Sequence, residues 1–256
     1  MTTPSLSPVG ELVRRADPDR FLTALFAPPA RREALLTLYA FNVELSRASA
    51  VTSEPMLAFI RLQWWREVVG GARKPHEVAT PLAALLDDGT LDRAELLALI
   101  DAREAEAEPI ATLEDWQGYL LASAGGLAVA AGRVLGAPGH AGLRLLGGAY
   151  GVAGLLRSVP ALAARGRCML PEDVLAAHGF TVEAVPTATG TALRPVLDTL
   201  AATGRDWMNA GRANPLPRMA RAAGLCAVLA KRDLRRPGDP APRGVFDRLA
   251  VFAAAV

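Results

Sequence analysis

Apolar residues recur at spacings of three and four along nearly the whole chain, and this helical period limits the fold more than any other feature. Within residues 30–51, for example, Leu35, Leu38, Tyr39 and Asn42 fall on one face of a helix. No segment alternates apolar and polar residues for long enough to predict a strand, and no fixed-period repeat or break in composition separates two domains. The sequence therefore predicts a single all-α domain over residues 1–256.

Helix start and stop signals divide this pattern into successive helices. Pro55 follows Ser53 and Glu54 and opens a helix that runs to Gly70. Thr112 and the acidic residues after it have the pattern of a capping box before another long helix. The boundaries together predict helices at residues 30–51, 55–70, from 80, from 92, 112–133, 138–165, 191–210, 214–231 and 243–254.

The composition indicates a folded protein with a mostly aliphatic core. Apolar residues make up 51% of the chain and aromatic residues only 5%. The formal net charge of +2 argues against nucleic acid as a partner. Two cysteines, Cys168 and Cys226, are too few for a disulfide framework and fit a reducing compartment. The first residues lack the pattern of a secretory signal, so we expect the protein in the cytoplasm.

Charge is spread unevenly along the chain. Residues 87–115 hold ten acidic side chains and two arginines, whereas residues 205–248 hold ten basic and four acidic side chains. We interpret each segment as a solvated helix face, and the basic one alternatively as a contact for an acidic partner or anionic lipid. The apolar tail, residues 249–256, is expected to dock on the bundle rather than on lipid. The charge-free stretches 116–132 and 145–156 are shorter than a membrane span and are interpreted as buried helices.

Sequence motifs for common catalytic and metal sites are absent. The histidines, His76, His140 and His178, stand in no spacing typical of metal ligands. No segment matches a phosphate-binding glycine loop or the nucleophile elbow of a hydrolase. Asp101, Glu104 and Glu108 share a predicted helix face by their spacing, which we interpret as solvated. We therefore expect no metal and no cofactor.

Glycines inside two predicted helices need an explanation, because each costs about 1 kcal/mol relative to alanine there. They are the pairs at residues 125–126 and 147–148, followed by Gly151 and Gly154. One interpretation is close helix packing on a face of small residues. The other is room for a long apolar ligand between helices. The sequence leaves both open.

Three segments resemble the squalene/phytoene synthase family: YAFN at residues 39–42, IRLQWWRE at 60–67, and GAYGVAGLLRSVPALAARGRCMLP at 148–171. The most specific part is the frame formed by Arg157, then Gly166 and Arg167, then Leu170 and Pro171, which the family writes as R-D-x-x-x-D…G-R-x-Y-L-P. The resemblance implies an all-α isoprenoid-synthase-like helical bundle around an apolar cavity. It also implies two facing helices whose aspartates hold Mg²⁺ on prenyl diphosphates.

The aspartates that the family uses for magnesium are missing from the matching positions. By this resemblance, the aspartate positions of the first motif, which begins at Tyr39, fall on Ser46, Arg47 and Ala50. The aspartate positions of the second motif, which begins at Arg157, fall on Ser158 and Leu162. Ionising a prenyl diphosphate requires magnesium to neutralise the leaving group, and Mg²⁺ prefers carboxylate oxygens. The sequence therefore predicts the family fold with its metal chemistry removed.

A first hypothesis is a non-catalytic binding or assembly factor. The segments LYAFNVEL, SEPMLAFIRLQWWRE and LIDAREAE are similar to a branch of the family that includes mitochondrial complex I assembly factor 6. This resemblance implies a peripheral role at the inner membrane in the biogenesis of respiratory complex I. The partner would then be a respiratory-complex subunit or another acidic protein.

A second hypothesis is an isoprenoid or prenyl diphosphate transferase with a metal-independent diphosphate site. Arg47, Arg157 and Arg167 are its candidate anion-binding residues, since arginine binds phosphate through two donors. Structural pairing within the bundle is the favoured alternative for Arg157 and Arg167, and the role of Arg47 stays open.

A third hypothesis is the binding of an apolar, isoprenoid-like ligand without turnover. Asn42, Tyr150, Gly151 and Gly154 are the candidate wall of its cavity.

Overall fold

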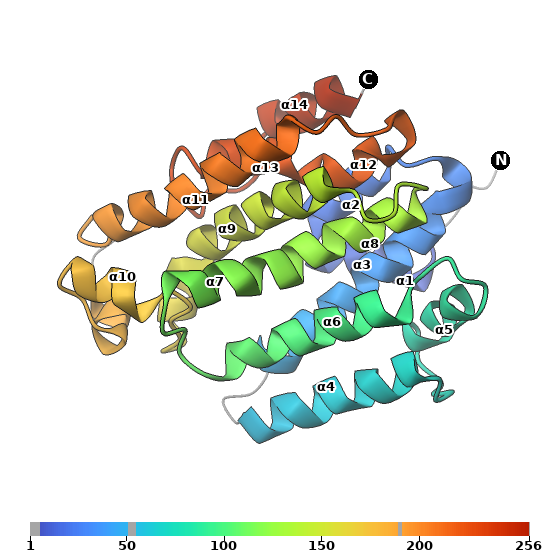
Figure 1. Cartoon of the computed structure of the whole chain (residues 1–256), viewed down its shortest axis with the longest axis horizontal. Helices are drawn as coiled ribbons and strands as arrows, with labels where there is room; N and C mark the ends of the chain where they lie inside the picture. The colour runs from blue at the N-terminus through green and yellow to red at the C-terminus, as the bar shows by residue number, and fades with distance from the viewer. Residues whose placement is uncertain (1–5, 51–54, 189–190, 256) are drawn as a thin grey trace.

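The computed structural model describes residues 6–50, 55–188 and 191–255, and these residues form helices and connecting loops without a strand (Figure 1). The predicted all-α fold class is confirmed. The helices are α1 (Pro8–Ala16), α2 (Pro18–Ala24), α3 (Pro29–Ala50), α4 (Pro55–Gly70), α5 (Ala79–Asp87), α6 (Arg93–Glu104), α7 (Leu113–Leu120), α8 (Gly126–Val134), α9 (Ala141–Ala163), α10 (Glu172–Ala177), α11 (Arg194–Arg212), α12 (Arg221–Gly224), α13 (Cys226–Asp233) and α14 (Val245–Ala255).

The long helices lie roughly parallel to one another in a bundle, with α4 at one edge and α14 at the other (Figure 1). The first core cluster is formed mainly by α1, α3, α4, α5, α6 and α8, and includes Phe41 and Trp65. The second is formed mainly by α7, α9, α10 and α11, and includes Trp116 and Leu200. Helix α9 contributes Leu143 to the first cluster and its later turns to the second. This helix therefore connects the two clusters.

Two predicted helices are interrupted. The segment expected as one helix over 112–133 is α7, a π-helical segment at Leu121–Gly125, and α8 in direct succession. The segment expected over 214–231 is instead a 3₁₀ turn at Arg218–Ala220 followed by α12 and α13. Pro215 and Pro217 explain the late start, because proline lacks the N–H that a helix interior requires.

Helix α9 is, among the described residues, the one helix long and apolar enough to cross a membrane by length and composition alone. In the bundle it packs against α8, α11 and α13. Helices cover it from several directions, as is typical of a core helix.

The tail docks on the bundle through one side of α14 only. Helix α14 buries Val251 completely, but Leu249 and Phe252 are 55% and 57% exposed. The helical period explains this result: Asp247, Val251 and Ala255 form one stripe toward the bundle, while apolar residues also occupy the other faces.

Candidate functional site

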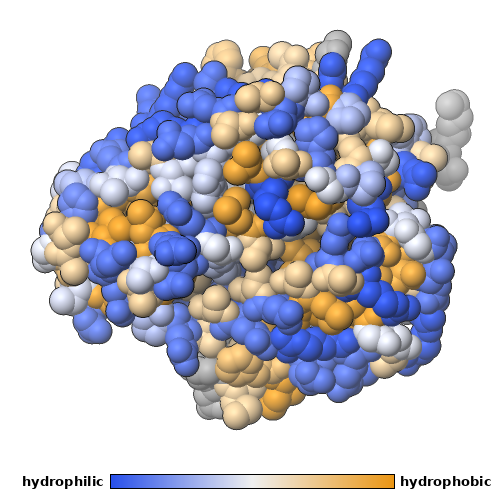
Figure 2. All heavy atoms as spheres, in the orientation of Figure 1, coloured by the Kyte–Doolittle hydropathy of each residue, from blue (hydrophilic) through white to orange (hydrophobic). Residues whose placement is uncertain are grey.

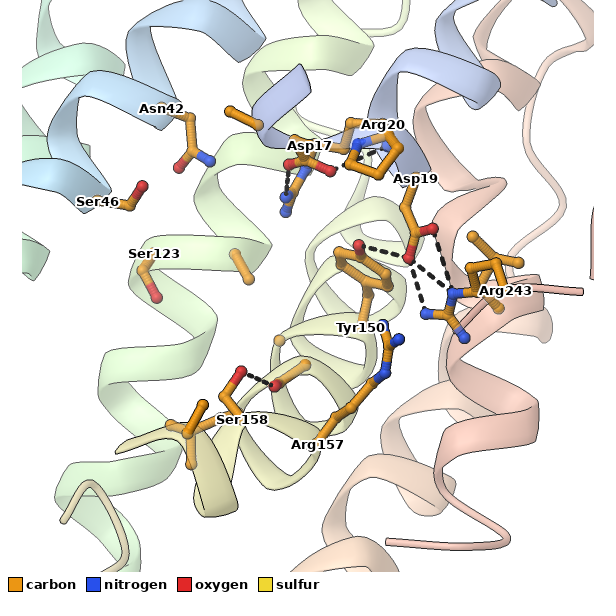
Figure 3. A pocket seen from close by; sticks show the side chains of 18 of the residues that line it. Asp17, Asp19, Arg20, Asn42, Ser46, Ser123, Tyr150, Arg157, Ser158 and Arg243 are labelled. Carbon is orange, nitrogen blue, oxygen red and sulfur yellow. Dashed lines mark hydrogen bonds and ion pairs between the residues drawn. The ribbon is translucent and has the colours of Figure 1, made fainter. Parts of the chain in front are cut away.

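A partly open cavity of about 1100 Å³ lies inside the bundle, between α2, α3, α7, α9 and the loop before α14. Helix α3 contributes Asn42, and α9 contributes Tyr150, Gly151 and Gly154. The structure thus places all four candidate wall residues on one cavity. Figure 3 shows Asn42 on one side of the space and Tyr150 across it.

The glycines of the bundle divide between the two interpretations. A Cβ on Gly147 would lie 2.6 Å from the Ala124 carbonyl oxygen, so this glycine permits close approach of α9 to the π-helical segment. A Cβ on Gly154 would meet nothing within 4 Å, and Gly154 lines the cavity. Close packing and cavity space therefore both occur, at different residues of α9.

Three of the five positions that match the family's aspartates face the same cavity. Ser46 on α3 and Ser158 and Leu162 on α9 all line it. The Ser46 hydroxyl donates to the Val43 carbonyl at 2.8 Å, and the Ser158 hydroxyl donates to the Gly154 carbonyl at 2.8 Å. The side chain of Ala50 lies outside the described part of the structure.

The three candidate anion-binding arginines are not brought together. Arg47 does not line the cavity; it is exposed and pairs with Glu44 at 2.7 Å. Arg157 and Arg167 do line it. Arg157 donates to the Ala241 carbonyl at 2.8 Å, and its buried Nε has no hydrogen-bond partner among the described residues. Arg167 donates to the Glu106 carbonyl at 3.3 Å.

Carboxylates on the cavity wall are bound by arginines. Asp17, which caps α2, pairs with Arg20 at 2.6 Å. Asp19 accepts a hydrogen bond from the Tyr150 hydroxyl at 3.2 Å and pairs with Arg243 at 2.7 Å. Figure 3 shows this network beside the cavity, with Arg243 reaching Asp19 from the C-terminal segment.

A second polar network lies farther along the wall. Arg103 pairs with Glu106 at 2.6 Å and donates to the Asn42 side-chain oxygen at 2.8 Å. The Tyr119 hydroxyl donates to Glu106 at 2.7 Å. Burial, and next the charge of Glu106, raise the pKa of Tyr119, so the phenol keeps its proton and remains a donor.

Seven arginines and four carboxylates line the cavity, so the formal charge of its lining is +3. The described residues contain no group of three or more His, Cys, Asp or Glu side chains that could hold a metal ion. Asp101 and Glu104 lie outside the cavity and pair with Arg66 at the surface. A site for several Mg²⁺ ions needs free carboxylate oxygens. The cavity instead presents serine hydroxyls, a leucine and carboxylates that are paired with arginines, so its lining does not fit such a site.

The profile of the squalene/phytoene synthase family matches residues 13–247. The chain belongs to the squalene/phytoene synthase family. Its structure is similar to that of squalene synthase HpnC from Alicyclobacillus acidocaldarius, with a TM-score of 0.74, 20% identity, and coverage of 89% of this chain and 90% of the other. A dehydrosqualene synthase solved with a ligand gives a TM-score of 0.78 at 15% identity, covering 96% and 93%. These likenesses confirm the isoprenoid-synthase-like bundle.

Curated members of the family also resemble the chain. It is 30% identical over 183 residues to "NADH dehydrogenase (ubiquinone) complex I, assembly factor 6" from Mus musculus, covering 68% of this chain and 55% of the relative. The homolog of this factor from Drosophila melanogaster is 30% identical over 188 residues, covering 68% and 56%. The chain spans about half the length of these relatives. The predicted similarity to this branch of the family is confirmed.

Several lining residues were not among the predicted site residues. Asp17, Asp19 and Arg20 come from helices that the sequence analysis did not name, and Arg103 and Arg243 come from segments interpreted as solvated. A usable signal precedes α2, since an N-cap aspartate followed by proline is typical of a helix start. No local signal marks Arg243, because its partner on the cavity wall, Asp19, is 224 positions away in the sequence.

Proposed function

We propose that this protein is a non-catalytic member of its family that acts as an assembly factor for respiratory complex I. The similarity to relatives named as assembly factors supports the role. One structural observation carries the non-catalytic part: Ser46, Ser158 and Leu162 face the cavity where the family's motifs carry aspartates. The carboxylates that remain on the wall are bound by arginines.

The chemistry of the cavity supports this proposal. Ionisation of a prenyl diphosphate breaks its C–O bond and releases diphosphate with about three negative charges, and magnesium ions normally bridge the oxygens of this leaving group. Two networks, Asp17 with Arg20 and Glu106 with Arg103, keep their carboxylates paired, so recruiting them to a metal would leave arginines buried without counter-charges. The partner we propose is a subunit or assembly intermediate of the respiratory complex.

The first experiment deletes the encoding gene and measures assembled complex I on native gels. We expect less assembled complex and less NADH:quinone oxidoreductase activity in membranes, and recovery of both with the wild-type chain. A strain with normal levels of the complex would contradict the assembly role.

The second experiment tests catalysis separately. Purified protein is incubated with farnesyl or geranylgeranyl diphosphate and Mg²⁺, and released diphosphate and hydrocarbon products are measured. We expect no release above a boiled control. Metal-dependent turnover would contradict the proposal that the protein is non-catalytic. It would not affect the assembly role, which the gene deletion tests separately.

A second candidate function is metal-independent diphosphate transfer. The observation that favours it is the buried Arg157 Nε, which lines a cationic cavity and has no hydrogen-bond partner among the described residues. In calorimetry without metal, this candidate predicts pyrophosphate binding that Arg157→Met weakens roughly tenfold. Arg47→Met is the matched control, since Arg47 lies outside the cavity. Equal affinity for pyrophosphate in the wild type and the Arg157 variant would exclude this second candidate function.

A further inference from the structure

Helix α14 exposes most of its apolar side chains to solvent. Phe246 is 86% exposed, Val245 69%, Phe252 57% and Leu249 55%. The helix is held to the bundle chiefly through Val251. This side chain packs in a small third cluster with Leu229 of α13 and with Leu225, the residue that precedes α13. Figure 1 places α14 at the outer edge of the molecule, and Figure 2 shows apolar side chains along that edge.

The exposed apolar surface continues onto the turn that follows α2. Phe252 contacts Phe26 edge-on, with ring centroids 6.0 Å apart, and Leu25 beside Phe26 is 43% exposed. We call this surface the α14 face, defined by Leu25, Val245, Phe246, Leu249 and Phe252. An apolar face of this kind on the outside of a bundle marks an interaction site.

Basic side chains accompany the α14 face. Arg248 is exposed on the helix and has no ion-pair partner among the described residues. Lys231, Arg235 and Arg236 are exposed on α13 and the turn that follows it, and α13 packs against α14. The one acidic side chain on α14, Asp247, pairs with Arg232. The charge that accompanies the α14 face is therefore positive.

We propose that the α14 face docks on a bilayer that contains anionic lipid. This helix has the pattern of an interfacial helix, because bulky apolar residues lie on its outer side and arginine and lysine lie beside them. In such a helix the apolar side chains enter the headgroup region, and the cations contact lipid phosphates. Asp247 and Arg248 of the same helix also line the cavity, so docking brings the cavity toward the membrane surface. The proposal does not depend on the assembly role.

A vesicle experiment tests it with the full chain. Purified protein is sedimented with phosphatidylcholine vesicles, with or without phosphatidylglycerol. We expect binding to the anionic vesicles that falls as salt is added, because screening weakens the attraction between arginine and lipid phosphates. Phe246→Ser with Leu249→Ser should lower the partition coefficient roughly tenfold or more, since it removes two large apolar side chains from the lipid contact. Arg248→Glu should weaken binding to the anionic vesicles in particular.

A second exposed apolar surface among the described residues, on α4, supplies the matched control. Met56 and Ile60 on α4 are 67% and 58% exposed, and α4 lies at the opposite edge of the bundle (Figure 1). Met56→Ser with Ile60→Ser should leave vesicle binding unchanged, while circular dichroism checks that both double variants are folded.

Three outcomes would overturn the proposal. They are wild-type protein that binds neither kind of vesicle, an α14 variant that binds as well as the wild type, and equal losses in both double variants. A dimer seen by light scattering that the α14 substitutions dissociate would instead assign the α14 face to a second copy of the chain.

Discussion

Arg243 connects the two ends of the chain. Its guanidinium lies 2.7 Å from Asp19 on α2 and 2.7 Å from Asp233 at the end of α13, and the three side chains are only 12%, 11% and 5% exposed. Ion pairs at an exposed surface contribute little to stability, but removing one partner of a buried group leaves charges unpaired. This arginine therefore fixes the loop before α14 beside the cavity.

Replacing Arg243 should destabilise the fold strongly. We expect Arg243→Met to lower the free energy of unfolding by about 3–5 kcal/mol, because two buried carboxylates lose their counter-charge. Urea unfolding followed by circular dichroism measures the change. Arg194→Met is the control: its ion pair with Asp198 leaves both side chains 48% exposed, and a loss of no more than about 1 kcal/mol is expected. Equal losses of unfolding free energy in the two variants would show that the buried network adds no more stability than an exposed ion pair.

Helix α9 has different requirements at successive turns. Near Gly147 it approaches the π-helical segment so closely that a methyl group would lie 2.6 Å from the Ala124 carbonyl oxygen. Two turns later, at Gly154, it borders open space in the cavity. The same residue type therefore allows packing at one position and leaves room for a ligand at the other.

Alanine substitutions separate these two roles. Gly147→Ala should destabilise the protein by roughly 1–3 kcal/mol, since the added methyl group forces the helices apart. Gly154→Ala should stabilise it by about 0.5–1 kcal/mol, because alanine has the higher helix propensity and nothing obstructs its Cβ. Thermal unfolding of both variants gives the comparison. A destabilised Gly154 variant would contradict the open space at that turn.

The whole bundle depends on α9 to join its two large core clusters. Trp64 and Trp65 lie in or against the first cluster, and Trp116 and Trp207 lie in or against the second. Because α9 contributes side chains to both, unfolding of either cluster removes packing partners from this helix.

The two clusters should therefore unfold together. In one variant the tryptophans of the first cluster are replaced by phenylalanine, and in another those of the second. Within each variant, the urea midpoint from tryptophan fluorescence should equal the midpoint from circular dichroism, although the two variants differ in overall stability. Separate midpoints within either variant would indicate two independently folding units.

Fold class and family follow from local information in the chain. The spacing of residues such as Leu35, Leu38 and Asn42 predicts helices because a helical period repeats over neighbouring residues. The frame around Arg157 and Arg167 identifies the family because motif residues keep their spacing along the chain. The late start before α12 was missed although Pro215 and Pro217 mark it locally, whereas no sequence pattern marked the π-helical segment at Leu121–Gly125.

The electrostatics of the cavity and the exposure of α14 could not be read from neighbouring residues. Asp19 and Arg243 are 224 positions apart, and only folding brings them within hydrogen-bond distance. Periodicity marks α14 as an apolar helix, but how much of it is covered depends on the helices beside it, which bury Val251 and leave Phe246 exposed. Helix formation depends on contacts within a few residues, whereas ion pairing and burial depend on segments that meet after the chain has folded.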